Sequence, residues 1–188
     1  MAQVVCVRVT WNGSAPPLPP LWWRDGDYIY RAKFFPIDVH PTIDDPVGRK
    51  GYALARAWQT LRGDTDGMLI LDGDVIIDPT HLAAMMGCID SDPGCVWTAP
   101  VKIWPVSTHR RDWVWAHWET KASQEIDEHP RWFSFCFTYL PRPLIDAAIR
   151  SGLRSWVYPK VDSNVARAAQ RMGITARTVP CFPIHTHW

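Results

Sequence analysis

The stretch Leu69–Asp78, LILDGDVIID, decides between two folds. Asp72-Gly73 between two apolar runs is typical of a tight β-hairpin, in which residues 69–71 would pair with residues 75–77. The same sequence also fits a buried strand with carboxylates at its end, where the chain leaves the sheet. The first interpretation predicts a β-rich structural module, and the second predicts an α/β enzyme.

The sequence on either side of this stretch favours the buried strand. Residues 49–63 repeat apolar residues at helical spacing, and Gly63 can end that helix. Residues 78–89 open with Asp-Pro-Thr, which is a typical helix start. A strand between two helices is characteristic of a parallel sheet, in which ligands gather beyond the carboxyl ends of the strands.

The rest of the chain continues this alternation. It predicts an α/β fold of the Rossmann-like kind, with a mostly parallel sheet flanked by helices. At 188 residues we expect a single domain, and no repeat or linker divides the chain. Further strands are expected at residues 4–10, 27–35, 95–101, 131–140 and 174–180, and further helices at 141–152 and 161–173.

Composition limits the class of protein and its location. Apolar residues make up 47% of the chain, which is typical of a globular protein. The net charge of +1 gives no general attraction to a polyanion, although a local patch can still form. No apolar run approaches the ~20 residues of a membrane span, and no signal-peptide pattern is present. We therefore expect a soluble protein of the cytoplasm.

Asp72 and Asp74 are the first candidates for a metal site. In an extended strand they point the same way, and Gly73 between them allows a ligand to approach the backbone closely. Two carboxylates suit Mg²⁺ or Mn²⁺, which usually bind phosphate oxygens as well. His185 and His187 have the same spacing, so one of them could complete the metal shell. The alternatives are an incidental histidine pair on a surface tail and a Zn²⁺ site.

A family resemblance is carried by residues 48–86, which read GRKGYALARAWQTLRGDTDGMLILDGDVIIDPTHLAAMM. They resemble the nucleotide-sugar glycosyltransferases of GT-A fold, especially the large family 2 group. In that family a Lys/Arg-Gly pair opens a helix, and a strand ending in Asp-x-Asp and a second helix follow. Residues 156–179, WVYPKVDSNVARAAQRMGITARTV, resemble the segment whose acid begins a helix and serves as the catalytic base.

The resemblance implies a role for each acid. Asp74 would be the main metal ligand, Asp72 would lie near the ribose or donor sugar, and Asp162 would be the catalytic base. Because Asp is a favoured N-cap, a structural role for Asp162 at its helix start is the alternative. In the same family a C-terminal histidine often binds the metal, which would be His185 or His187 here.

Weaker assignments concern the nucleotide. Thr10, Trp11 and Asp38 follow the first two strands, where the family holds the nucleobase, and Trp11 fits a core position equally well. Arg49 and Lys50 precede a helix and could meet the diphosphate or the nucleobase. Two cations at a helix start oppose the helix dipole, which favours function over a solvated helix start.

The expected reaction is transfer of one sugar from a nucleotide-diphosphate sugar, with a UDP-sugar as the favoured donor, to an acceptor hydroxyl. The chain lacks the Gln-x-x-Arg-Trp motif of processive members and has Val161-Asp162 where the family often has Glu-Asp. A polymerising synthase is therefore not expected. Residues 1–100 would bind the nucleotide sugar, and residues 101–188 would bind the acceptor and, through the tail, the metal.

Residues 107–131 join basic side chains to closely spaced tryptophans, and we expect them to meet the acceptor. This mixture suits a phosphate-bearing acceptor, such as a hydroxymethylated base flipped out of DNA, which some bacteriophage enzymes glycosylate. A loop over a small molecule, lipid or protein is the alternative.

Three other classes of protein stay open. One is a nucleotidyltransferase of similar fold, which needs a Gly-rich loop of which residues 10–20 are a poor version. The others are a Zn²⁺ hydrolase and a non-catalytic Trp-rich module that binds carbohydrate or nucleic acid.

Overall fold

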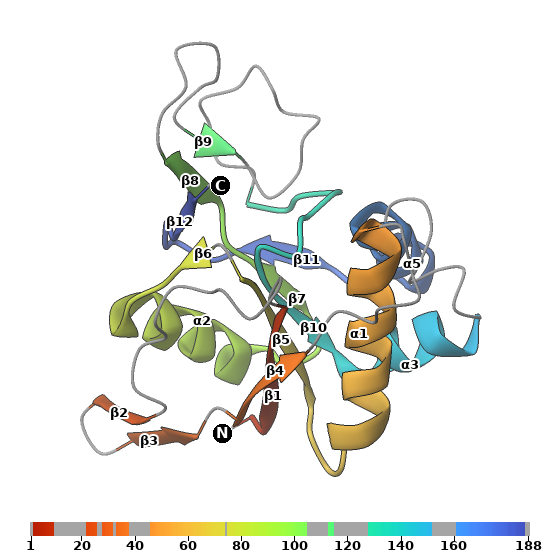
Figure 1. Ribbon diagram of the computed structural model, residues 1–188, viewed down its shortest axis with the longest axis horizontal. Coiled ribbons are helices and arrows are strands. Elements are labelled where there is room, and N and C mark those ends of the chain that lie inside the picture. The colour runs from red at the N-terminus through yellow and green to blue at the C-terminus, as the bar shows by residue number, and fades with distance from the viewer. Residues whose placement is uncertain are drawn as a thin grey trace.

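A six-stranded sheet lies at the centre of the molecule, with the order β11-β7-β10-β5-β1-β4 (Figure 1). All its strands run parallel except β10, which is antiparallel to both of its neighbours. The strands are β1 (Val4–Val9), β4 (Lys33–Ile37), β5 (Gly67–Asp72), β7 (Val96–Thr98), β10 (Phe137–Pro141) and β11 (Ala176–Thr178). The computed structural model describes residues 2–9, 22–25, 28–31, 33–37, 46–73, 75–104, 113–114, 128–151 and 161–186.

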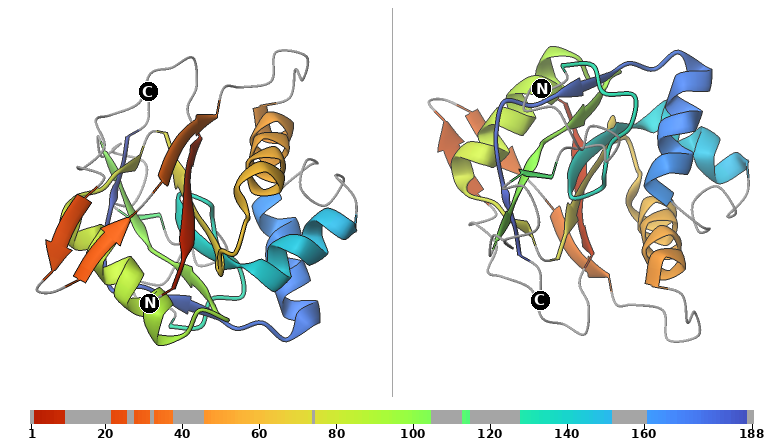
Figure 2. Two further views of the ribbon diagram at one scale, coloured as in Figure 1. Left: turned by 90° about the horizontal axis from the view of Figure 1, so that it is seen from below. Right: turned by 90° about the horizontal axis from the view of Figure 1, so that it is seen from above.

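Helices cover both faces of this sheet. Figure 2 shows α1 (Pro46–Leu61), α3 (Arg142–Arg150) and α5 (Val161–Met172) on one face and α2 (Pro79–Ser91) on the other. The predicted α/β fold with a mostly parallel sheet flanked by helices is confirmed. None of the helices in the described ranges is long and apolar enough to cross a bilayer.

Two smaller sheets complete the architecture. One has the order β6-β12-β8-β9 and joins residues that are far apart in the sequence. Its strands are β6 (Val75–Ile76), β12 (Ile184–Thr186), β8 (Val101–Trp104) and β9 (Trp113–Val114). The other pairs β2 (Trp22–Asp25) with β3 (Tyr28–Arg31).

The hairpin interpretation of Leu69–Asp78 is wrong. β5 pairs with β1 on one edge and with β10 on the other, so neither edge is left for β6. β6 instead pairs with β12 in the second sheet. The chain therefore leaves the main sheet at the end of β5 and enters the second sheet after only two intervening residues.

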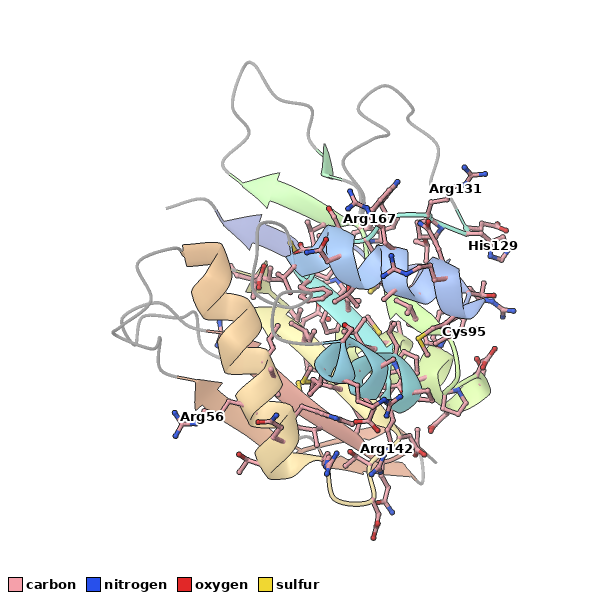
Figure 3. The ribbon with its side chains drawn as sticks, turned by 90° about the vertical axis from the view of Figure 1, so that its right-hand side faces the viewer. Arg56, Cys95, His129, Arg131, Arg142 and Arg167 are labelled. Carbon is pink, nitrogen blue, oxygen red and sulfur yellow. The ribbon has the colours of Figure 1, made fainter. Side chains whose placement is uncertain are left out.

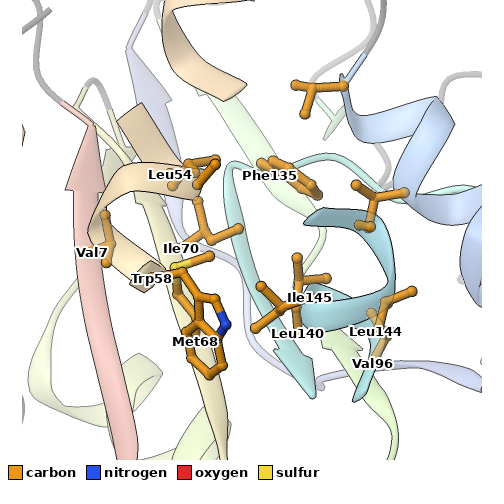
Figure 4. Close-up of a cluster of buried hydrophobic side chains, with 14 of the residues drawn as sticks. Val7, Leu54, Trp58, Met68, Ile70, Val96, Phe135, Leu140, Leu144 and Ile145 are labelled. Carbon is orange, nitrogen blue, oxygen red and sulfur yellow. The ribbon is translucent and has the colours of Figure 1, made fainter. Parts of the chain in front are cut away.

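The buried residues of β5 explain why it is a central strand. Met68 and Ile70 pack on the face covered by α1, where Figure 4 shows them beside Leu54 and Trp58 of that helix. Alternate β5 side chains lie in a second apolar cluster with residues of α2. A strand buried on both faces has an unbroken apolar sequence, which is what residues 67–71 have.

Asp78 starts α2 as the sequence predicted. Its Oδ1 accepts hydrogen bonds from the His81 backbone N–H at 2.9 Å and from the Thr80 hydroxyl at 2.6 Å. Burial acts to raise the pKa of Asp78, but these hydrogen bonds outweigh it and lower the pKa below its ordinary value. The cap fixes the direction in which the chain leaves β6.

The expected strand over residues 131–140 is only half correct, because β10 begins at Phe137. Two backbone groups in the segment before it bond to side chains of α5. The Gln170 side-chain amide donates to the Arg131 carbonyl at 2.6 Å, and the Phe135 N–H donates to the carboxylate of Asp162 at 3.3 Å. Side chains of α5 thus replace the ladder partners that a strand would need.

Gly67 provides a test of the packing between β5 and β10. A Cβ at this position would overlap the Leu140 carbonyl oxygen and the Tyr139 ring, so Gly67→Ala should lower the free energy of unfolding by about 1–3 kcal/mol. The control is Gly87→Ala on α2, where a Cβ meets nothing within 4 Å, and it should raise that free energy by about 0.5–1 kcal/mol. Urea denaturation measures both values, and equal stability of the two variants would contradict this packing.

Candidate functional site

The candidate site lies where β5 ends. The Asp72 backbone N–H donates to the Cys136 carbonyl at 3.0 Å, which holds the end of the strand against the segment before β10. The Asp72 side chain is partly exposed, and strand alternation turns it toward the face that carries α1 and α5. A partly exposed carboxylate at the carboxyl end of an inner strand can meet a ligand.

Arg8, a buried residue of β1, holds the peptide of Gly73, which follows Asp72. Its side chain is only 5% exposed, and its Nη2 donates to the Gly73 carbonyl at 2.9 Å. Burial raises the pKa of the neighbouring Cys6 thiol to about 12, although the charge of Arg8 acts in the opposite direction. This arginine was missed by the sequence analysis, although a lone cation in the apolar run VVCVRV was a usable signal.

The C-terminal strand β12 returns to the same place. His185 lies opposite Val75 in the antiparallel pairing of β12 with β6. Val75 follows Asp74 in the sequence, so the backbone of His185 lies across from the residue next to the predicted metal ligand. The expectation of an extended tail is confirmed for residues 184–186, which form β12.

Asp162 reaches the site from α5. This helix begins at Val161, so Asp162 is the second residue of its first turn. It is therefore not the N-cap residue of the alternative interpretation, because an N-cap precedes the first helical residue. Its Oδ2 accepts a hydrogen bond from the Phe135 N–H at 3.3 Å, and the next residue, Cys136, accepts the hydrogen bond from Asp72. Two adjacent residues therefore bond to Asp72 and Asp162, which are far apart in the sequence.

Several predicted site residues lie wholly or partly outside the described part of the chain. Arg49 and Lys50 fall within the first five residues of α1 rather than before it, and the structure describes only their backbone, as it does for His185. Within the described ranges, no three His, Cys, Asp or Glu side chains are placed to hold a metal ion. Five further predicted site residues lie outside the described ranges, namely Thr10, Trp11, Asp38, Asp74 and His187.

The predicted acceptor region is described at residues 113–114 and 128–131. Beside it, Figure 3 shows Arg131 and Arg167 near one another along α5. The Arg167 guanidinium lies over the Trp132 ring at 5.4 Å, which is cation–π distance. Both arginines are exposed. Arg167 is on the same helix as Asp162, and Arg131 is held against that helix by Gln170.

Comparison with known proteins identifies a shared fold. No family model and no curated protein matches the chain. The crystal structure of A197 from STIV is similar, with 13% sequence identity and a TM-score of 0.50 over 98% of this chain and 82% of that chain. CMP:2-keto-3-deoxy-manno-octonic acid synthetase complexed with CTP is also similar, with 13% identity and a TM-score of 0.52 over 99% of this chain and 91% of that chain.

The hydrogen bond between Phe135 and Asp162 can be tested through stability. Asp162→Ala leaves a partly buried N–H without its partner, so the free energy of unfolding should fall by about 1–3 kcal/mol. Asp162→Asn keeps an acceptor oxygen at the same position, and its loss should stay below about 1 kcal/mol. Urea denaturation of both variants measures the two losses in free energy of unfolding. Equal losses would contradict a role for this oxygen in holding the segment before β10.

Proposed function

We propose that this chain is a metal-dependent glycosyltransferase that moves one sugar from a nucleotide-diphosphate sugar to an acceptor hydroxyl. The observation that carries the proposal is the pair of hydrogen bonds through Phe135 and Cys136, which bring Asp162 and Asp72 to one edge of the sheet. The fold supports it as well, because a similar structure is a synthetase that binds CTP.

The donor set fits a hard divalent cation. We propose that Asp74 holds Mn²⁺ or Mg²⁺ together with His185 or His187, and that Asp72 lies near the ribose or donor sugar. Carboxylate oxygens are preferred by both ions, and imidazole suits several divalent metals. The pairing of β12 with β6 supports the histidine assignment. A bound cation would offset the negative charge that develops on the leaving diphosphate.

Asp162 is proposed as the base that accepts the proton of the acceptor hydroxyl. Its Oδ2 bonds to a backbone N–H, which fixes the carboxylate while Oδ1 can receive a proton. Asp162 is the acidic residue in the first turn of α5, so the helix holds its carboxylate next to the segment before β10.

On the nucleotide side, we propose that Thr10, Trp11 and Asp38 meet the nucleobase, with a UDP-sugar as the favoured donor. β1 and β4 support this side of the proposal, because both run parallel to β5 and thus end at the same edge. Arg49 and Lys50 would meet the diphosphate from the first turns of α1. An arginine and a lysine are both suited to phosphate oxygens.

On the acceptor side, we propose that residues 107–131 receive the acceptor and that a hydroxymethylated base in DNA is one candidate. The exposed Arg131 and Arg167 support a phosphate-bearing acceptor, because guanidinium groups bind phosphate in a bidentate manner. The net charge of +1 restricts such binding to a local contact.

A nucleotidyltransferase is the second candidate, and the likeness to the CTP-bound synthetase is the specific observation that favours it. The two reactions differ in their products. A glycosyltransferase releases a nucleoside diphosphate from the sugar nucleotide, whereas a nucleotidyltransferase joins a nucleotide to a sugar and releases pyrophosphate. Incubation with CTP and a panel of free sugars, followed by a pyrophosphate assay, separates them.

The donor and the metal can be identified by thermal shift. The melting temperature should rise only when Mn²⁺ and one nucleoside diphosphate or its sugar are present together. At a ligand concentration of 100 times the Kd, the free energy of unfolding should increase by about 2.7 kcal/mol. Asp74→Asn should abolish the rise. Asp64→Asn, which alters an exposed aspartate in the turn after α1, should keep it. Stabilisation by Zn²⁺ alone, with no response to nucleotides, would overturn the transferase in favour of a hydrolase.

The base can be tested by kinetics with the donor so identified. Asp162→Asn should lower the transfer rate by about 10²–10⁴-fold and leave the donor KM almost unchanged, because only proton removal is lost. The control is Asp146→Asn on α3, where the carboxylate accepts from the Trp58 indole at 2.9 Å and should affect stability alone. Duplex DNA with and without hydroxymethylated bases and free monosaccharides serve as acceptors. An unchanged rate in Asp162→Asn would refute the assignment.

A further inference from the structure

Arg8 interrupts an otherwise apolar strand. Within β1, Val5 and Val7 pack in the apolar cluster on the α1 face, and Cys6 packs in the cluster on the α2 face. Strand alternation places Arg8 on the same face as Cys6, where it is 5% exposed. Burial of a guanidinium costs free energy unless it is compensated by hydrogen bonds or opposite charge. A buried arginine at this position therefore needs specific hydrogen-bond or charge partners.

One partner of Arg8, the Gly73 carbonyl, lies where the chain passes from the main sheet to the sheet that contains β6. Gly73 follows the last residue of β5 and precedes the start of β6 by two positions, so its peptide belongs to neither strand. Arg8 is opposite Leu71 in the pairing of β1 with β5, and its Nη2 reaches forward to the Gly73 carbonyl at 2.9 Å. The side chain thus fixes the peptide at which the chain leaves the main sheet.

The residues that flank Gly73 in the sequence are Asp72 and Asp74, the acids assigned to the donor sugar and to the metal. Glycine has the most freely rotating backbone of any residue, so an unrestrained Gly73 would leave the spacing of these two positions undefined. We infer that Arg8 is a positioning residue, which holds the Gly73 peptide between the two assigned positions and thereby supports binding of the divalent cation together with the nucleotide. This inference rests on the proposed function.

A matched arginine is present at the other end of β5. The Arg142 Nη1 donates to the Gly63 carbonyl at 3.0 Å and to the Thr65 carbonyl at 3.1 Å, before the strand begins. Both arginines therefore hold a glycine carbonyl next to β5. Only Arg8 does so at the end where the acids lie, so the Arg8 and Arg142 variants separate positioning of the site from general stability.

The experiment is a titration with Mn²⁺ in the presence of the nucleoside diphosphate found by thermal shift, followed by the electron paramagnetic resonance signal of free Mn²⁺. Arg8→Met should raise the Kd for Mn²⁺ by about 10–100-fold, which is the usual effect of losing a group that orients metal ligands. Arg8→Lys keeps a donor and the charge and should give an intermediate Kd. Arg142→Met should lower the melting temperature and leave the Kd unchanged.

The outcomes separate this inference from the proposed function. Wild-type protein that binds no Mn²⁺ overturns both. Wild-type binding with an unchanged or tighter Kd in folded Arg8→Met overturns only the positioning role, and a tighter Kd would mean that Arg8 acts mainly by repelling the cation. If Arg8→Met does not fold, Arg8→Lys decides: a Kd equal to that of the wild type overturns the inference, and a weaker Kd supports it.

Discussion

The position of β5 is the constraint on which the rest of the structure depends. Its two edges pair with β1 and β10, and both of its faces are covered by apolar clusters. A register shift of one residue would turn Met68 and Ile70 to the opposite face, which neither cluster could accommodate. The core therefore determines where β5 ends, and apolar residues hold Asp72 at the edge of the sheet.

The antiparallel direction of β10 supplies the second half of the site. Because Phe137 pairs with Leu71, the amino end of β10 lies beside the carboxyl end of β5. Residues that precede β10 are thus brought next to Asp72, whereas a parallel strand would carry them to the opposite edge. Phe135 and Cys136 occupy this place, and Phe135 in turn bonds to Asp162. Strand direction alone thus brings α5 into the site.

The sequence predicts local features well where a pattern repeats or a motif is short. The apolar run before Asp72, the cap at Asp78 and the strand between two helices agree with the structure. The expected strands over residues 27–35 and 95–101 each divide into two strands that belong to different sheets. The sequence could not predict that residues 131–136 would fail to form a strand, because their partners are side chains of a helix that follows later. Nor could it predict that β6 pairs with β12, since strands of two or three residues carry almost no periodicity.

Two departures from the expected pattern lie at one edge of the main sheet. Arg8 occupies an apolar position of β1, and the carboxylate of Asp162 replaces a strand partner for Phe135. A chain selected only for stability has no reason to bury a charge in a strand of its core. The location of both departures, beside the carboxyl ends of β1 and β5, is where an open α/β sheet binds its ligand.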